Sequence, residues 1–184
     1  MKFTPLAIPD IILVETYLHG DDRGYFAETF RQDLFNNAVS SQINFIQDNE
    51  SKSSKGVLRG LHYQLSPFSQ SKLVRVIKGS VLDVAVDIRK SSPTFGHHIA
   101  VELSANNKKQ LFVPKGFAHG FVVLSDTATF TYKVDCFYAP EYERSIAFDD
   151  KDLKIDWQLS ADILKLSKKD QNSPSLLDAK DLFD

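Results

Sequence analysis

Residues 81–89 alternate strictly between aliphatic side chains and a more polar set. A period of two is typical of a strand that packs one face against an apolar core. Gly79 before the segment, and the Ser-Ser-Pro run at 91–93 after it, are turn formers that limit its length. We therefore predict a strand whose two faces differ. Leu82, Val84, Val86 and Ile88 form the aliphatic face, which packs against the core. Asp83, Ala85, Asp87 and Arg89 form the opposite, mostly polar face.

Further short segments have strand character, and turn residues separate them at short intervals. They are residues 72–77, 97–103, 110–113, 120–124 and 127–134. Helical periodicity is confined to residues 32–40 and, more weakly, to residues 160–166. Many short strands at close spacing favour a sandwich or barrel. The predicted fold is all-β, with short helices near the N-terminal third and the C-terminus.

Composition narrows the classes of function. A chain of 184 residues fits one domain, 1–184, with a core large enough to be stable without disulfides or metals. The net charge of -2 argues against a general nucleic-acid or membrane-surface role. Cys136 is the only cysteine, which favours a reducing compartment. Prolines interrupt the N-terminal apolar run and no stretch is long enough for a membrane helix, so we expect a cytoplasmic protein.

The segment GVLRGLHYQ, residues 56–64, holds the strongest chemical signal. It places His62 three residues after Arg59, and Lys72 follows. A neutral imidazole can act as a base at cellular pH, and it needs a carboxylate to fix its tautomer. The planar fork of Arg59 suits a phosphate. From the residues alone, a structural role for His62 is equally compatible, and its acidic partner is open between the aspartates of residues 81–89 and Asp170.

A metal site is the alternative interpretation of the histidines. The sequence PKGFAH contains Pro114, Gly116 and His119 in the pattern PxGxxH, which is one half of the metal motif of cupin barrels. The other half, HxH with a downstream glutamate, is incomplete, because Gln64 stands two residues after His62 in place of the second histidine. Two imidazoles are fewer than the three protein ligands of a typical catalytic zinc site. We therefore predict no metal.

Two tyrosines are further candidates. Tyr132 lies in the alternating segment TATFTYKV, residues 127–134, on the same face as Phe130. Ordinary packing explains it from the strand alone, and the functional alternative is a proton donor opposite His62. Tyr138 could stack on a ring or pack in the core.

Six segments of the chain, in matching order and spacing, resemble the dTDP-4-dehydrorhamnose 3,5-epimerase family. They are DDRGYFAETF at 21–30, QDNESKSSKGVLRGLHYQ at 47–64, KLVRVIKGSVLDVAVDIRKSSPTFG at 72–96, PKGFAHGFVVLS at 114–125, YKVDCFYAPEYE at 132–143 and LSKKD at 166–170. The resemblance covers nearly the whole chain. It implies a cupin-type jelly-roll β-barrel or sandwich, as a single epimerase domain.

The resemblance also implies roles for individual residues. His62 matches the catalytic base, with Asp170 as its partner and Asp83 as the alternative. Tyr132 matches the general acid, and Lys72 matches the lysine near the C4 oxygen of the substrate. Further positions match those that hold the nucleotide sugar, with Phe26 and Tyr138 flanking the base or the sugar ring: Arg23, Phe26, Glu28, Gln47, Asn49, Arg59, His119, Tyr138, Glu143 and Lys169.

The implied activity is metal-free and cofactor-free epimerisation at C3 and C5 of dTDP-4-dehydro-6-deoxy-D-glucose, giving dTDP-4-dehydro-L-rhamnose. Family members are homodimers with exchanged N-terminal strands, so Arg23, Phe26 and Glu28 are expected to serve the neighbour's site. Two alternatives are open: a mono-epimerase acting at C3 or C5 of a related sugar, and a non-catalytic sugar-nucleotide-binding cupin. Arg144 and Phe148 depart from the family's usual Gly and Trp.

Overall fold

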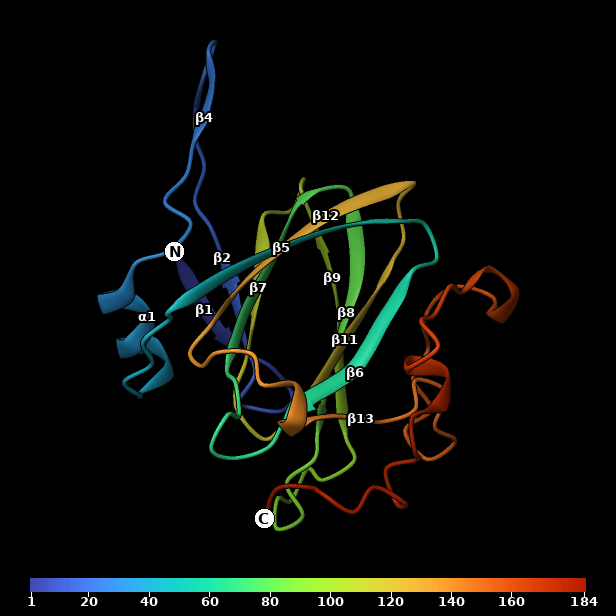
Figure 1. The fold of residues 1–184 in the computed structure, drawn as a ribbon. Helices are drawn as coiled ribbons and strands as arrows, with labels where there is room; N and C mark the ends of the chain where they lie inside the picture. Colours follow the sequence, from blue (N-terminus) through green and yellow to red (C-terminus); the bar gives the residue numbers. More distant parts are fainter.

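Two antiparallel sheets face each other in the computed structural model, which describes residues 1–184 (Figure 1). The first sheet has six strands in the order β1 (Lys2–Pro5), β2 (Ile12–Glu15), β10 (Lys109–Val113), β7 (Lys72–Lys78), β12 (Thr127–Val134) and β5 (Gln47–Ser54). The second has five, in the order β13 (Glu143–Ser145), β6 (Leu58–Gln64), β11 (Phe117–Val123), β8 (Ser80–Asp87) and β9 (His98–Ser104). Most neighbours within a sheet are distant in sequence, as in a jelly roll. The all-β prediction is confirmed.

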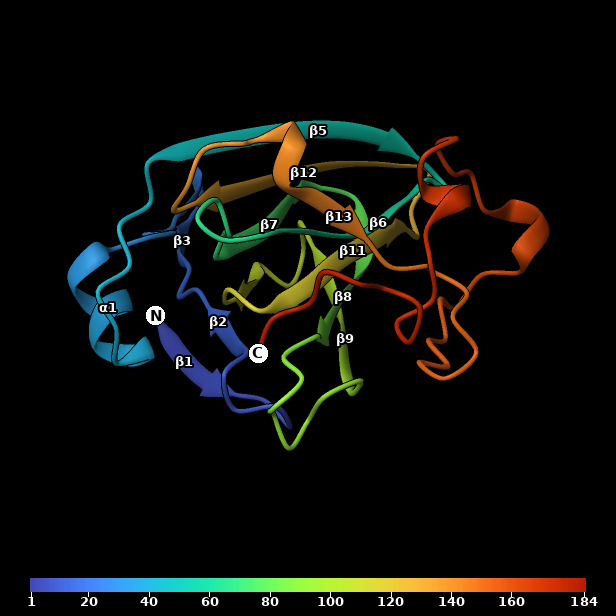
Figure 2. The same ribbon diagram turned by 60° about the horizontal axis from the view of Figure 1, so that its bottom comes forward.

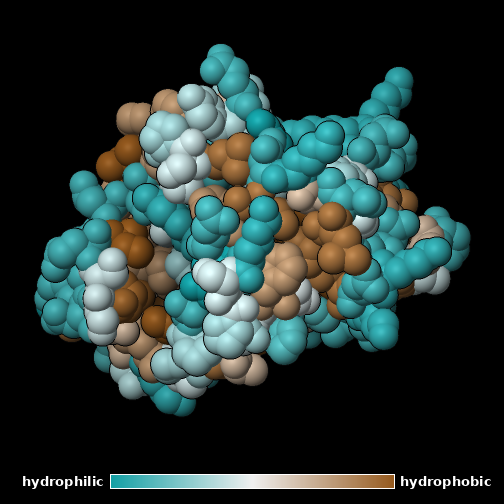
Figure 3. Space-filling model, turned by 90° about the horizontal axis from the view of Figure 1, so that it is seen from below, coloured by the Kyte–Doolittle hydropathy of each residue, from teal (hydrophilic) through white to brown (hydrophobic).

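Apolar side chains fill three layers. One cluster lies between the sheets and includes Val74, Phe121 and Phe130. A second, around Trp157, packs the C-terminal segment on the outer face of the five-stranded sheet, and Figure 2 shows this segment along that side. A third packs α1 (Gln32–Val39) on the six-stranded sheet through Phe35. On the face seen in Figure 3, apolar areas are broken up by polar side chains.

The predicted strand at 81–89 exists as β8, but its second face is not solvent-facing. β8 lies between β11 and β9, with the other sheet on one side and the C-terminal segment on the other. Leu82, Val84 and Val86 form a buried apolar face, as predicted, and this face packs under the C-terminal segment. Asp83 and Asp87 point to the opposite side and have no exposed surface. Alternation in sequence reports a difference in polarity between the two faces of a strand and does not report whether either face meets water.

The helical predictions met different outcomes. Residues 32–40 form α1, which ends at Ser40 in the left-handed region (φ 49°). The helix predicted at 160–166 is wrong, because only a 3₁₀ turn, η2 (Ala161–Ile163), forms there. Instead, the Lys165 N–H donates to the Gly56 carbonyl (2.8 Å) and the Lys165 carbonyl accepts from Leu58 (3.0 Å). The backbone at Lys165 thus forms its hydrogen bonds with the chain at the start of β6 and not within a helix. Two other 3₁₀ turns are η1 (Pro140–Tyr142) and η3 (Asp170–Asn172).

None of these helices has the length and apolar character needed to cross a membrane.

A two-stranded hairpin, β3 (His19–Asp21) and β4 (Gly24–Phe26), projects from the body of the molecule (Figure 1). All of its residues are exposed, including Phe26 at 71%. It touches the rest of the chain through Lys108, whose ammonium donates to the Tyr25 hydroxyl (2.7 Å) and lies 4.7 Å from the ring centre.

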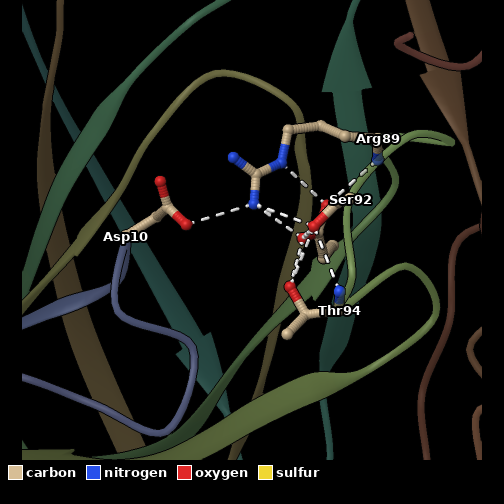
Figure 4. A network of polar contacts seen from close by, with 5 residues as sticks. Asp10, Arg89, Ser92 and Thr94 are labelled. Atoms are coloured by element: carbon tan, nitrogen blue, oxygen red, sulfur yellow. Dashed lines mark hydrogen bonds and ion pairs between the residues drawn. The ribbon is translucent and has the colours of Figure 1, made fainter.

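The buried Asp87 holds the loop that follows β8 through a network of polar contacts. Figure 4 labels the other members of this network, Asp10, Arg89, Ser92 and Thr94. The Asp87 carboxylate accepts hydrogen bonds from Arg89 (2.7 Å), Ser92 (2.6 Å) and Thr94 (2.6 Å), and Arg89 also reaches Asp10 in the β1–β2 turn (3.2 Å). Desolvation favours the neutral acid, but these donors outweigh it and lower the pKa of Asp87 to about 2. The network therefore has a structural role, because it fastens two turns together.

Candidate active site

A cavity of about 350 Å³ receives side chains from both sheets and from the C-terminal segment. Nine of the fourteen site residues predicted from the sequence line it. Of the predicted site residues it is lined by Arg59, His62, Lys72, His119, Tyr132, Tyr138, Glu143, Lys169 and Asp170. A larger hollow, of about 600 Å³, lies by α1 and the β1–β2 turn, but its charged residues pair with one another, Arg89 with Asp10 and Lys115 with Asp135. Convergent reactive groups make the smaller cavity the candidate site.

His62 is bound to Asp170 at its centre. The imidazole Nε2 lies 2.6 Å from Asp170 Oδ1. Asp170 is the first residue of η3 and is only 4% exposed. Desolvation raises the pKa of this carboxyl, but hydrogen bonds from His62 and Ser167 and the charge of Lys169 outweigh it, so the pKa is lowered. The carboxylate therefore stays anionic and accepts the Nε2–H, which leaves Nδ1 of His62 as the free basic nitrogen.

Ser167 supports this pair and was not predicted as a site residue. Its hydroxyl donates to Asp170 Oδ2 (2.9 Å), and the Asp170 backbone N–H donates back to the same hydroxyl (3.1 Å). The signal was within LSKKD, since a serine three residues before an aspartate commonly closes such a turn.

Arg59 and His62 both reach the cavity although they are three residues apart, a spacing that puts side chains on opposite faces of a regular strand. The pairing of β6 with β11 shifts register between His119 and Phe121, which breaks the alternation of β6. This irregularity requires two facing glycines. A Cβ on Gly60 (φ 135°) would lie 2.5 Å from the Cα of Gly120.

Lys72 begins β7, and its half-buried ammonium makes no ion pair within this chain. Desolvation lowers its pKa to about 8, and the nearby charges of Asp83 and Glu143 oppose part of that effect. At neutral pH the ammonium is therefore mostly protonated and has no partner. It is placed to face an anionic or polarised oxygen in the cavity.

Tyr132 enters the cavity from β12, in the sheet that faces the one carrying His62. Its ring packs against Phe130, with centroids 6.0 Å apart. Desolvation raises the pKa of the phenol, with the charge of Arg59 opposing it, so the hydroxyl is protonated at neutral pH. The cavity thus has a base on one wall and a proton donor on the other.

Glu143 links three parts of the wall. Its carboxylate accepts a hydrogen bond from the Tyr138 hydroxyl (2.7 Å) and forms an ion pair with Lys169. Desolvation raises the pKa of Glu143, but these two partners outweigh it, and the pKa is lowered. β13 is thereby joined to the C-terminal segment immediately before Asp170.

The second pocket histidine has its own carboxylate. His119 Nε2 lies 2.9 and 3.0 Å from the oxygens of Asp83, and both residues are buried. Desolvation raises the pKa of Asp83, against the opposing effects of His119 and Lys72. Asp83 was the alternative partner for His62, and the structure pairs it with His119 instead.

Five predicted residues lie outside the cavity. Gln47, Asn49 and Ser51 lie on the same face of β5, and Ser51 lines the cavity. Gln47 and Asn49 therefore extend this face beyond the cavity. Their side chains bind each other (2.8 Å). Arg23, Phe26 and Glu28 lie on or after the projecting hairpin, where the Arg23 side chain is 89% exposed. A single chain does not bring these three to the cavity.

Other neighbours of the site were not predicted. Arg59 donates to the Ser53 hydroxyl (3.2 Å), and Ser51 lines the cavity; the alternation that begins at Gln47 could have identified both serines. The two departures from the family pattern lie outside the wall. Arg144 binds Asp181 (2.8 Å), and Phe148 packs in the cluster around Trp157.

Two facing antiparallel sheets with a polar cavity between them make this a cupin-type jelly roll, and its cavity is equipped to move protons. The family model for dTDP-4-dehydrorhamnose 3,5-epimerase matches residues 5–178. The chain belongs to this family.

Individual relatives match nearly end to end. A dTDP-4-dehydrorhamnose 3,5-epimerase of Shigella flexneri is 55% identical over 179 residues, which are 97% of this chain and 98% of that protein. The crystal structure of dTDP-4-dehydrorhamnose 3,5-epimerase from Elizabethkingia anophelis matches with a TM-score of 0.94 at 49% identity, covering 98% of each chain. The dTDP-6-deoxy-D-glucose-3,5-epimerase of Legionella pneumophila, in complex with dTDP-4-keto-L-rhamnose, matches with a TM-score of 0.94 at 47% identity, covering 99% of this chain and 97% of that one.

Proposed function

We propose that this protein is an isomerase that inverts C3 and C5 of dTDP-4-dehydro-6-deoxy-D-glucose and supplies dTDP-4-dehydro-L-rhamnose for dTDP-L-rhamnose biosynthesis. Membership of the family and the ligand of the Legionella pneumophila relative support the substrate. One observation carries the chemistry: the His62–Asp170 pair and Tyr132 enter one cavity from opposite sheets. An inversion at carbon needs a base on one face of the ring and an acid on the other.

The first step is removal of a proton next to the ketone. The hydrogens at C3 and C5 are both α to the C4 carbonyl, so loss of either gives the same kind of enolate. His62 takes this proton on Nδ1, and the Asp170 carboxylate stabilises the imidazolium that forms.

Lys72 stabilises the negative charge that develops on the C4 oxygen. Its ammonium has no partner in the chain and lies in a desolvated wall. A preorganised donor at a developing oxyanion contributes on the order of 3 kcal/mol.

Tyr132 completes the inversion by giving its proton to the carbon from the opposite face. The C–H bond broken on the His62 side is thus replaced by one formed on the Tyr132 side, and the carbonyl is restored. The His62 imidazolium then loses a proton to solvent and the Tyr132 phenolate gains one from solvent, which restores both groups. The same cycle at the second carbon inverts the second centre.

Cations at the edge of the cavity hold the rest of the substrate. Arg59 and Lys169 bind the diphosphate, for which the planar fork of Arg59 gives paired hydrogen bonds. His119 and Glu143 contact the sugar, Tyr138 flanks a ring, and Gln47 and Asn49 extend the binding face along β5. Binding energy from these remote groups orients the ring between base and acid.

The projecting hairpin supports a homodimer with exchanged N-terminal strands. It exposes large apolar side chains, including Tyr25 at 59% and Phe26 at 71%, away from its own cavity. In the proposed dimer, Arg23, Phe26 and Glu28 complete the neighbour's site. The whole chain, 1–184, acts as one domain, and its single cysteine suits the cytoplasm.

Subunit complementation tests this arrangement. Homodimers of His62→Ala and of the double variant Arg23→Ala/Phe26→Ala are each expected to be inactive or nearly so. If the hairpin serves the neighbour, a mixed dimer has one intact site, and mixing after reversible dissociation restores activity. Absence of restoration in verified mixed dimers would assign the hairpin to its own chain or to neither site.

A coupled assay tests the reaction itself. A reductase specific for dTDP-4-dehydro-L-rhamnose oxidises its nicotinamide cofactor only when both centres have been inverted. Steady oxidation is expected from the wild-type protein. Product inverted at one carbon supports the mono-epimerase, and no product at all supports a non-catalytic binding protein.

A further inference from the structure

Tyr138 lies on a segment that forms no regular structure of its own. Residues 135–139 connect β12 to η1, and Phe137 and Tyr138 are 60% and 56% exposed. Yet the Tyr138 hydroxyl is directed at Glu143 in the cavity wall (2.7 Å). An exposed connection has little packing to define its path, so other contacts must fix where this ring lies.

Gln64 supplies those contacts. It is the last residue of β6, two positions after His62, and is only 5% exposed. Its Nε2 donates to the carbonyls of Phe137 (3.2 Å) and Phe68 (2.6 Å), while its Oε1 accepts the Ala139 N–H (2.7 Å). One amide therefore binds the backbone on both sides of Tyr138 and ties it to the loop before β7.

Nearby contacts continue this attachment without reaching Tyr138. Gln70 donates to the Cys136 carbonyl (2.7 Å), and Asp135 accepts the Ser71 N–H (2.7 Å). Ser71 immediately precedes Lys72. The segments leading to Lys72 and to Tyr138 are thus held against each other from Asp135 to Ala139.

We propose that Gln64 is a positioning residue that sets the place of Tyr138, and through it Glu143, relative to His62. The inference rests on the proposed function for its kinetic consequence. The residue type is specific, because the position needs a donor and an acceptor on one side chain. Glutamate would accept from Ala139 but would not donate to the two carbonyls, and methionine would do neither.

The first test compares Gln64→Met with a matched control, Gln32→Met. Gln32 is a partly buried glutamine in α1 that also donates to a backbone carbonyl, that of Ile43, far from the cavity. In Gln64→Met we expect the Ala139 amide to lose protection from hydrogen exchange, and kcat to fall about tenfold or more, because small misplacements of positioned groups are costly. Gln32→Met is expected to change neither.

The second test asks whether Gln64 acts through Tyr138. In a Tyr138→Ala background no ring remains to be positioned, so adding Gln64→Met should lower kcat by less than about twofold further. A penalty from Gln64→Met that is equal in both backgrounds would overturn the proposal, since it would indicate a general loss of fold. Unchanged Ala139 protection in Gln64→Met would overturn it as well.

Failure of the proposed function gives a different result. In that case the wild-type protein itself produces no epimerised sugar. The positioning claim is then decided by the exchange of the Ala139 amide alone, measured on Gln64→Met, Gln32→Met and the wild type.

Discussion

At the scale of residues, two histidines line the cavity and each is paired with a carboxylate, but the surroundings of the two carboxylates differ. Asp170 keeps a lowered pKa, because His62, Ser167 and Lys169 outweigh its desolvation. Asp83 has a raised pKa, because its burial is not fully offset by His119 and Lys72. Only the first pair combines a carboxylate whose pKa is lowered with an imidazole that is partly exposed to the cavity. This difference favours His62 as the base.

Asp170→Asn tests that assignment. The amide keeps the size of the side chain but removes the charge that stabilises the imidazolium, so kcat should fall by on the order of 10²–10⁴. Asp178→Asn, a change at an exposed aspartate of the same C-terminal segment, is the control and should leave kcat unaltered. Retention of wild-type turnover in Asp170→Asn, measured in the coupled assay, would remove the pair from the mechanism.

Lys72→Met should remove activity and raise stability. The folded-state pKa of about 8 lies below the ordinary lysine pKa of 10.5, so the folded state binds this proton less well than the unfolded chain does. The protonated ammonium therefore destabilises the fold at neutral pH, by up to on the order of 3 kcal/mol, and stability recovers as the pH rises from about 8 toward 10.5. Denaturant unfolding should show Lys72→Met to be more stable at pH 7, with a smaller difference at pH 10. Equal or lower stability at pH 7 would contradict the assigned desolvation.

The same titration predicts an alkaline limit of activity. Turnover should decline as the pH rises through about 8, because Lys72 then loses the charge that faces the C4 oxygen. In Lys72→Arg, any residual activity should persist to higher pH, since guanidinium stays protonated. A pH–kcat profile of that variant that is unshifted relative to the wild type would assign the alkaline limb to another group.

At the scale of elements, the register shift in β6 brings Arg59 and His62 to one cavity. Gly60→Ala should destabilise the fold by roughly 1–3 kcal/mol and lower kcat, because its Cβ would lie 2.5 Å from Gly120 in a backbone region (φ 135°) that L-residues avoid. Gly20→Ala in the hairpin, where the nearest atom would be 3.5 Å away, is the matched control and should be tolerated. Thermal unfolding of both variants measures the difference, and similar costs for the two would show that the close approach at Gly60 is unimportant.

Element-scale features also show how far the sequence could predict the structure. Alternation and strand composition located six of the thirteen strands, β7 to β12, to within a few residues, because pleat and side-chain period are local properties. They missed β1 to β6 and β13. The burial of Asp83 and the extended path at Lys165 depend on neighbours distant in sequence, and no local pattern reports them. The family resemblance implied that His62, Lys72 and Tyr132 share one site, and all three line one cavity in the structure. The pairing of His119 with Asp83 and the backbone hydrogen bonds of Gln64 could not be predicted, because they depend on the register of the sheets.

At the scale of the whole molecule, the cavity is built from parts of the chain that are far apart in sequence. His62 and Tyr132 come from the two facing sheets and Asp170 from the C-terminal segment, while the hairpin projects away from the body of the molecule (Figure 1). The Asp170 end of this segment is held to β13 by Lys169 with Glu143 and by Ser173 with Ser145 (2.8 Å). Farther along, the same segment packs on the outer face of the five-stranded sheet in the cluster around Trp157.

Proton NMR of dTDP-4-dehydro-6-deoxyglucose, incubated with the protein in deuterated water, tests the central claim most directly. The account predicts that deuterium enters at both C3 and C5 with wild-type protein, and at neither carbon above the uncatalysed rate with His62→Ala. Exchange at one carbon only would contradict double epimerisation. Exchange at both carbons that survives loss of His62 would contradict the mechanism.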